Sequence, residues 1–234
     1  MTNTQSEKTQ KPRRDVVDPT FPRKLIGGYA HFRKNRLKRE KERYEEMAEK
    51  GQSPDTMIIA SCDSRSAPET IFGAAPGEIF VVRNVANIMP PYEQHGDYHS
   101  TSAALEFAVQ ALRVKHIVVM GHGRCGGISA FRQQMTGQEA EPLSPGDFIG
   151  KWISLLEPVA DRLECTGAET PEKLQTMLEE ESIRQSIDHL KTFPCVSTLL
   201  EREQISLHGA WFDISSGELW TMNHKTGVFE QPFD

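Results

Sequence analysis

The sequence has little cysteine, no long hydrophobic run and no excess of basic charge. Four cysteines among 234 residues are too few for a scaffold held by disulfides, so metal binding or catalysis are the informative uses of a thiol here. The longest aliphatic runs, such as residues 117–120, are too short to span a bilayer. The formal net charge of −6 argues against a surface devoted to nucleic acid. We therefore expect neither a membrane protein nor a nucleic-acid-binding protein.

The start of the chain also lacks a targeting signal. Residues 1–15 are polar and have no apolar stretch of the kind found in a signal peptide, so we expect a cytoplasmic protein with reduced thiols. The composition, 37% hydrophobic and 26% charged, is that of an ordinary globular protein. We expect a disordered tail at residues 1–20, a helical arm at 21–50 and a single α/β domain at 51–234.

The arm at residues 21–50 is predicted to be helical and strongly basic. Pro22 suits a first helical turn and Gly51 suits a stop, while Gly27–Gly28 could break the helix in two. Nine Lys or Arg residues face only two acidic residues between positions 23 and 43. A solvated helical face explains most of this charge, but the apolar residues of the arm still need a surface to cover. An arm lying on a partner subunit satisfies that need, and an RNA-binding helix is the weaker alternative.

Strand-like and helix-like segments alternate along the remaining chain. The pattern predicts strands at 56–61, 78–83 and 115–120, and helices starting at 68 and covering 100–113, 126–135, 147–163 and 171–193. Residues 204–214 and 218–222 are predicted to form a closing hairpin. This order favours an α/β fold with a central, mainly parallel sheet flanked by helices. We expect about five strands, the last of them antiparallel.

Two loops at the carboxyl ends of predicted parallel strands carry reactive side chains. They are Ser61-Cys62-Asp63-Ser64-Arg65 and Gly121-His122-Gly123-Arg124-Cys125-Gly126-Gly127. Open α/β sheets place their sites at such strand ends. Imidazole and thiolate are side chains that zinc prefers, and three protein ligands would leave a position for water. The glycines let a helix begin beside the site, where its backbone N–H groups face an anion.

These segments resemble the β-class carbonic anhydrases, in particular their plant-type branch. The similarity covers nearly the whole chain, from about Pro22 to Met222. Its motifs are GQSP at 51–54, CDSR at 62–65, PGEIFVVRNVAN at 76–87, SAALEFAV at 102–109, GHGRCGG at 121–127 and LHGAWFDISSGELW at 207–220. The resemblance implies a zinc lyase that hydrates CO2 reversibly to bicarbonate and a proton. It also implies a homodimer or larger homo-oligomer, with the arm reaching over the neighbouring subunit.

The resemblance assigns the zinc ligands only in part. The family's histidine and second cysteine match His122 and Cys125, while the first zinc-binding cysteine is replaced by Ser61. Cys62 is adjacent, but successive residues of a strand point to opposite faces, so we expect the Cys62 side chain in the core. Three outcomes stay open: zinc held by His122, Cys125 and Asp63, zinc held weakly beside Ser61, or no zinc.

The resemblance also assigns roles around the metal. The catalytic pair of the family matches Asp63, which would orient the attacking hydroxide, and Arg65, which would hold that carboxylate ionised. The substrate-binding positions match Gln52, Phe80, Val85, Phe107 and Gly126. His95 and His99 could shuttle protons, although exposed loop histidines without that role are the more common case.

Two other functions remain possible on the same residues. A hydrolase for carbonyl sulfide or carbon disulfide would use the same chemistry and differ only in substrate. A metal-poor, non-catalytic bicarbonate-binding relative would explain the serine at position 61. Zinc content and CO2 hydration separate this relative from the lyase.

Overall fold

The structure is a computed structural model that describes residues 20–94, 99–138, 142, 146–163 and 169–232. The chain divides into two compact units, Met1–Ala48 and Glu49–Asp234. Within the described residues, no helix is both long and apolar enough to cross a membrane.

The first unit is helical, as the sequence predicts, but its break lies elsewhere. Helix α1 covers Arg23–Lys34 and α2 covers Arg36–Lys50, which runs two residues past the unit's end. The expectation of a break at Gly27–Gly28 was wrong. The helices part at Asn35, whose side-chain amide donates to the carbonyl oxygen of His31 over 3.0 Å. Asparagine side chains compete in this way for the backbone groups of a helix, whereas an interior glycine costs only about 1 kcal/mol.

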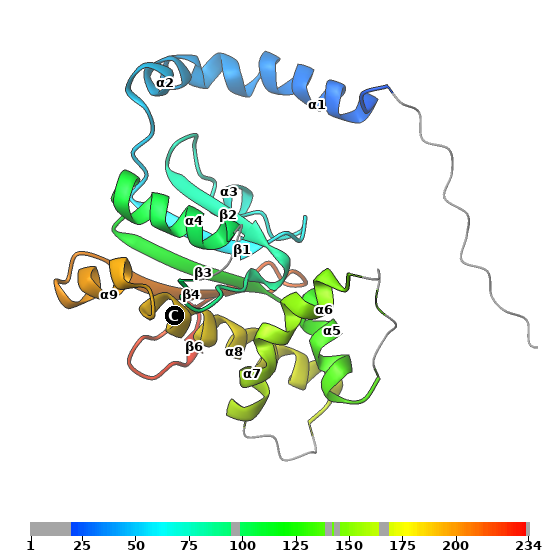
Figure 1. Ribbon diagram of the computed structural model, residues 1–234. Helices are drawn as coiled ribbons and strands as arrows, with labels where there is room; N and C mark the ends of the chain where they lie inside the picture. The colour runs from blue at the N-terminus through cyan, green and yellow to red at the C-terminus, as the bar shows by residue number, and fades with distance from the viewer. Residues whose placement is uncertain (1–19, 95–98, 139–141, 143–145, 164–168, 233–234) are drawn as a thin grey trace, which may run out of the picture. The chain divides into compact units, whose positions relative to one another are not determined.

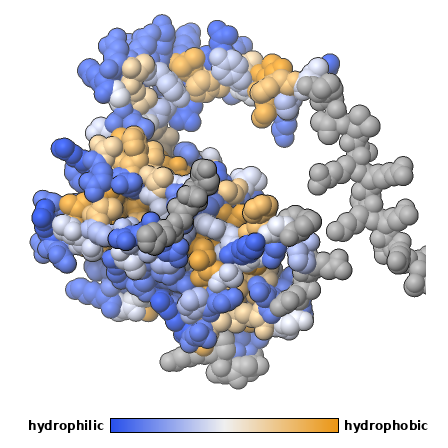
Figure 2. Space-filling model, in the orientation of Figure 1, coloured by the Kyte–Doolittle hydropathy of each residue, from blue (hydrophilic) through white to orange (hydrophobic). Residues whose placement is uncertain are grey.

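Large apolar side chains of α1 are exposed. Neither α1 nor α2 has a buried residue, and Leu25, Ile26 and Tyr29 are more than half exposed. Figure 2 shows the two helices as a mostly hydrophilic surface with apolar patches between the charged side chains. Such patches on a helix are typical of a surface that another chain covers.

The second unit contains one six-stranded sheet with the order β2-β1-β3-β4-β5-β6. The first four strands in this order run parallel, and β5 and β6 are antiparallel to their neighbours. The mainly parallel sheet is confirmed, but the sheet has one strand and one antiparallel pairing more than expected. Strand β6 has only two residues, too few for a periodic signal. The strands are β1 Thr56–Ser61, β2 Ile79–Asn84, β3 His116–His122, β4 Ser206–Phe212, β5 Leu219–Met222 and β6 Phe229–Glu230.

The helices of the second unit follow the predicted order with more interruptions. The segment at 100–113 ends in a π-helical turn, 147–163 is three short pieces, and a separate helix begins at Pro194, where proline is favoured in a first turn. The α-helices are α3 Pro68–Ile71, α4 Ser100–Glu106, α5 Gly126–Met135, α6 Phe148–Ile153, α7 Glu157–Arg162, α8 Pro171–Lys191 and α9 Pro194–Glu201; the short turns are Val85–Asn87, Phe107–Leu112 and Ser154–Leu156.

The alternating side chains of β1 enter two separate apolar clusters. Met57 and Ile59 pack with residues of β3 and α8, whereas Ile58 and Ala60 lie in a smaller cluster with Met120 of β3. Helix α8 packs along β3 and β4, as Figure 1 shows. Because both faces of β1 are buried, its register is fixed, and Ser61 extends the same row as Met57 and Ile59.

Candidate functional site

The two loops singled out in the sequence lie on neighbouring strands. Strands β1 and β3 pair in parallel, so the loop after Ser61 and the loop after His122 leave the same edge of the sheet. The Nη2 group of Arg65 donates to the carbonyl oxygen of Arg124 over 3.3 Å and joins the loops directly. The Oδ2 atom of Asp63 lies 4.0 Å from Nε2 of His122. The structure therefore brings the reactive side chains of both loops together.

Asp63 and Arg65 form a close ion pair in the first loop. Arg65 donates from Nη2 to Oδ2 over 2.6 Å, from Nε to Oδ1 over 2.9 Å and from its backbone N–H to Oδ1 over 2.9 Å. The side-chain hydrogen bond from Arg65 holds the pKa of Asp63 well below its usual range, and the bond from the Arg65 backbone N–H acts in the same direction. Asp63 is thus a fixed carboxylate that accepts hydrogen bonds and does not hold a proton at neutral pH.

The first loop is also fixed through its backbone. Arg83 of β2 donates from Nε to the carbonyl oxygen of Ser61 and from Nη2 to that of Asp63, each over 2.7 Å. The backbone N–H of Cys62 donates to the carbonyl oxygen of Asn84 over 2.8 Å. Arg83 belongs to the segment PGEIFVVRNVAN, but the sequence reasoning gave this arginine no role.

His122 presents one ring nitrogen without a partner. The residue is 1% exposed, and its Nδ1 lies 2.9 Å from the carbonyl oxygen of Gly123. A carbonyl only accepts, so Nδ1 carries the proton and Nε2 has a free lone pair. No hydrogen-bond partner for Nε2 exists among the described residues, and burial lowers the pKa of His122, which favours the neutral ring. A buried, unprotonated imidazole nitrogen of this kind is well suited to bind a metal ion.

Cys125 lies at the start of α5, and Glu179 of α8 holds its backbone. The Oε1 atom of Glu179 accepts from the Cys125 N–H over 2.9 Å and from Nε2 of Gln175 over 2.8 Å, and Oε2 accepts from Nε1 of Trp211 over 3.1 Å. The same Gln175 amide donates to the Cys125 carbonyl oxygen over 3.1 Å. Burial raises the pKa of Glu179 and that of the Cys125 thiol. Two side chains thus bind the Cys125 backbone directly, and two further hydrogen bonds hold Glu179 in place.

Glu179 was missed in the sequence, although a signal for it exists. It is only 2% exposed and lies on the buried side of α8, one position after Leu178 and four before Ile183. A carboxylate on the apolar side of a predicted amphipathic helix is unusual, because buried charges need partners. That pattern would have marked Glu179 as a residue with a specific task.

The donors present fit a zinc ion in part. The unpartnered Nε2 of His122 and the thiol of Cys125 are suitable ligands, and Asp63 offers a carboxylate nearby. However, the described part of the chain contains no group of three His, Cys, Asp or Glu side chains placed to hold a metal. The missing donor is at Ser61, which is 4% exposed and whose Oγ accepts from the Asp63 N–H over 3.2 Å.

The structure corrects the expectation for Cys62. Its side chain is exposed and is not part of the core. The reason is that β1 ends at Ser61, so the next residue already lies in the loop beyond the apolar cluster. The thiol adjacent to the missing ligand therefore faces solvent.

Two of the expected substrate-binding residues, Phe80 and Phe107, contact each other. Their ring centroids lie 5.9 Å apart with the rings tilted by 40°, and Phe107 is 50% exposed. Val85 lies against the start of α5, since a Cβ at Gly127 would approach Val85 Cγ1 within 2.8 Å. Gly126 opens α5, and Gln52 is an exposed loop residue.

The two candidate proton shuttles have different outcomes. His99 precedes α4 and is exposed. His95 lies outside the described residues.

Comparison with known proteins gives a consistent result. Residues 56–219 match a protein-family model described as carbonic anhydrase. Beta carbonic anhydrase 3 of Arabidopsis thaliana is 30% identical over 207 residues, which cover 87% of this chain and 78% of that protein. The region that matches the family model contains both loops and the parallel strands β1 to β4.

Solved structures are similar over the same region. The structure of the β-carbonic anhydrase CcaA is 29% identical, with a TM-score of 0.81 over 90% of this chain and 98% of that chain. A tetrameric β-carbonic anhydrase of the filamentous ascomycete Sordaria macrospora is 26% identical, with a TM-score of 0.72 over 89% of this chain and 98% of that chain.

Proposed function

The chain belongs to the β-carbonic anhydrase family, whose members are carbonate dehydratases, and we propose that it hydrates CO2 reversibly to bicarbonate and a proton with zinc as its cofactor. The observation that carries this proposal is the buried, unpartnered Nε2 of His122 next to the Asp63–Arg65 pair. A basic nitrogen that faces an ionised carboxylate in a buried site suits a cation and an activated water.

His122 and Cys125 would hold the zinc ion. The third protein position would fall to Asp63 or to the hydroxyl of Ser61. When bound, zinc supplies the Lewis acidity that makes water nucleophilic near neutral pH. A neutral hydroxyl is a weaker ligand than a thiolate, so Ser61 is expected to lower the affinity for zinc relative to a cysteine at this position.

Asp63 would orient the nucleophile and would not act as the base. Its two oxygens are ionised, and Arg65 fixes both of them. A carboxylate in this state accepts a hydrogen bond from the attacking water and directs the oxygen lone pair toward the carbon of CO2. Because the Arg65 hydrogen bond keeps the pKa of Asp63 so low, the released proton must leave through solvent or another group.

The apolar wall of the substrate site would include Phe80, Phe107 and Val85, which suits a small apolar molecule. Gln52 would donate a hydrogen bond to bicarbonate, and the N–H groups at Gly126 would face its charge. Phe107 and Val85 are exposed in a single chain. A second copy of the chain would cover them and close the pocket.

We accordingly propose a homodimer or a larger homo-oligomer in which the arm covers a neighbouring subunit. The exposed Leu25, Ile26 and Tyr29 of α1 support it, as does the tetrameric state of the Sordaria macrospora relative. Removal of residues 1–48 should shift the protein to a smaller species in size-exclusion chromatography. A dimer of unchanged stability in the shortened chain would contradict this role. The cytoplasmic location stays a prediction.

A metal-poor, non-catalytic bicarbonate-binding protein is the second candidate. The absence of a three-ligand group among the described residues favours it. Zinc analysis and stopped-flow CO2 hydration of the full chain separate the two functions. Under our proposal, hydration is measurable when zinc is in excess and disappears in His122→Ala. No hydration above the buffer rate at saturating zinc would instead support the binding protein.

A further inference from the structure

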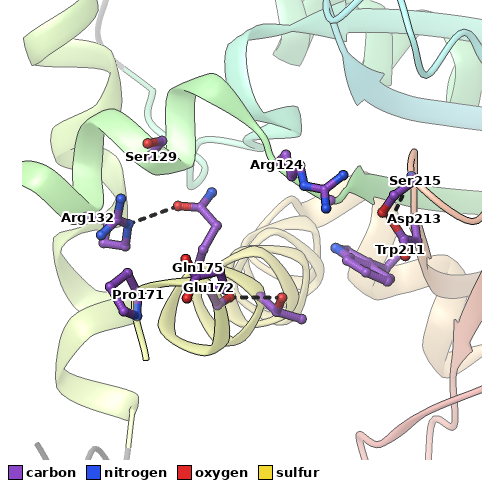
Figure 3. A pocket seen from close by; sticks show the side chains of 11 residues that line it. Arg124, Ser129, Arg132, Pro171, Glu172, Gln175, Trp211, Asp213 and Ser215 are labelled. Atoms are coloured by element: carbon purple, nitrogen blue, oxygen red, sulfur yellow. Dashed lines mark hydrogen bonds between the residues drawn. The ribbon is translucent and has the colours of Figure 1, made fainter. Parts of the chain in front are cut away.

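A polar cavity lies behind the loop that carries His122 and Cys125. Its volume is about 340 Å³, which is within the range of sites for small molecules. The walls come from the loop at 123–124, from α5, from the first turns of α8, and from the end of β4 with the turn that follows it. Figure 3 shows Arg132 near Gln175 on one side, with Arg124 closer to Trp211 and Asp213 on the other. None of the roles described above uses this cavity.

The cavity contains more hydrogen-bond donors than the described residues use. Arg132 donates only from Nε, to Oε1 of Gln175 over 3.2 Å, so its terminal nitrogens are available. The Arg124 side chain and the Ser129 hydroxyl have no hydrogen bond to any described residue. Arg124 also has a left-handed backbone with φ of 55°, which is strained for a residue other than glycine. Two guanidinium groups from different elements therefore face the same space.

Two carboxylates, Asp213 and Glu172, also line the cavity, and the charge of Arg124 acts on Asp213. Asp213 accepts from the N–H and hydroxyl of Ser215 and from the hydroxyl of Ser216, and these hydrogen bonds lower its pKa. Its oxygens are therefore occupied within the turn. Glu172 lies in the first turn of α8, where the helix dipole offsets a negative charge. The lining therefore offers a ligand the two guanidinium groups and the Ser129 hydroxyl, next to a carboxylate that is already engaged by Ser215 and Ser216.

Gln175 connects the cavity to the catalytic loop. Its Oε1 accepts from Arg132, and its Nε2 donates both to the Cys125 carbonyl oxygen and to Glu179. A ligand that binds the terminal nitrogens of Arg132 and moves its guanidinium would also move Nε, the donor to Gln175. The change then reaches the backbone of Cys125 through one side chain.

We propose that this cavity is a second binding site, which takes a small organic oxyanion with a carboxylate or phosphate group on Arg132 and Arg124. Guanidinium groups recognise both kinds of oxyanion through charge-assisted, often bidentate, hydrogen bonds. The face of the Trp211 indole leaves room for an apolar portion of the ligand. Occupancy of the site alters the hydrogen bond from Gln175 to the Cys125 backbone. It thereby shifts the position of Cys125 and regulates the activity of the loop that carries it.

The test uses titration calorimetry of the full chain with three probes at constant ionic strength: inorganic phosphate, glycerol phosphate and succinate. Binding of the phosphates alone identifies a phosphate site, and binding of succinate as well identifies a general oxyanion site. Arg132→Met should weaken binding about 10-fold or more, because a charge-assisted hydrogen bond is lost. The matched control is Lys173→Met, which removes an exposed cation of α8 that does not line the cavity and should leave affinity unchanged.

The coupling has a separate readout that does not depend on CO2 hydration. Saturation with the bound probe should shift the backbone amide resonance of Cys125 in the NMR spectrum of the wild-type chain and of Lys173→Met. Equal affinity in wild type and Arg132→Met, or no binding of any probe, would overturn the site. Binding that leaves the Cys125 resonance unmoved would overturn the regulatory part of the proposal.

Discussion

The two loops at the sheet edge differ in how completely they are equipped for a metal. The second loop presents a buried imidazole nitrogen without a partner and a buried thiol, both fixed by their neighbours. The first loop is fixed equally well by Arg83 and Arg65, but the position at which the resemblance expects a zinc-binding cysteine is a serine. Rigid positioning and suitable ligands are therefore separate properties of a site. Both loops of this chain are rigidly positioned, but only the loop with His122 and Cys125 carries the suitable ligands.

Strand parity explains why the neighbouring thiol does not replace the missing one. Ser61 continues the row of Met57 and Ile59, whereas Cys62 lies in the loop beyond the strand and is exposed. A slip of one residue would bring Cys62 to the metal, but it would also exchange the two buried faces of β1. Because that exchange would cost free energy, the Cys62 thiol stays out of the site although it is only one residue away.

Restoring the thiolate in the first loop should produce the largest effect. Ser61→Cys adds a second thiolate to the ligands His122 and Cys125. We expect zinc affinity to rise about 100-fold or more, because even the loss of groups that only orient ligands costs 10- to 100-fold. CO2 hydration at limiting zinc should rise in parallel. Competition with a chromophoric chelator measures the affinity.

The matched control for this variant is Cys62→Ser. Because the Cys62 side chain faces solvent, its removal should leave both zinc affinity and hydration unchanged. The proposed difference between the loops is contradicted if the wild-type chain already binds one equivalent of zinc tightly and Ser61→Cys does not raise the affinity. It also fails if Cys62→Ser loses zinc.

Periodicity and motif spacing predicted much of this architecture, because these features depend on residues that are close together in the sequence. Strand β1 was predicted with its observed bounds, because a buried parallel strand is a continuous apolar run. The positions of Asp63 and His122 on one sheet edge follow from the parallel connection of their strands. The break at Asn35 was not predicted, because it depends on one side-chain hydrogen bond to His31.

The partners of residues that act through tertiary contacts could not be predicted from the sequence, although its place on the apolar side of α8 marks Glu179 itself as unusual. Arg83 binds the carbonyl groups of a loop about twenty residues away, and Glu179 binds an N–H 54 residues away. Contacts between residues so far apart in the sequence produce no periodic pattern from which they could be predicted. The exposure of Cys62 depends on where β1 ends relative to its apolar cluster, which the sequence of the strand does not encode.

Removal of the support of the second loop should have the next largest effect. Glu179→Ala leaves the Cys125 N–H, the Gln175 amide and the Trp211 indole without their acceptor in a buried place. We expect a loss of unfolding free energy of about 3 kcal/mol, since each such group costs about 1–3 kcal/mol when unsatisfied. Urea denaturation of the two proteins measures this loss.

The control lies one residue further along the same helix. Glu180 is partly buried, and among the described residues its side chain pairs only with Arg184, at 3.2 Å, so Glu180→Ala should cost about 1 kcal/mol or less. Equal losses in both variants would mean that the second loop does not depend on Glu179. Retention of full zinc affinity by Glu179→Ala would show that the loop holds His122 and Cys125 without this support.

The smallest effect concerns the Asp63–Arg65 pair and depends on pH. The Arg65 hydrogen bond holds the folded pKa of Asp63 below its unfolded value, so the pair stabilises the fold above about pH 4, and this contribution is lost as pH falls through the folded pKa. In Arg65→Met the folded pKa of Asp63 should return toward its ordinary value, because the donor is gone. The unfolding free energies of wild type and variant should therefore differ at pH 6 and converge toward pH 2. Arg65→Lys keeps the charge without the paired geometry and should fall between them. A difference that is the same at every pH would show that Arg65 stabilises the loop by packing alone, and that the first loop owes its order to Arg83.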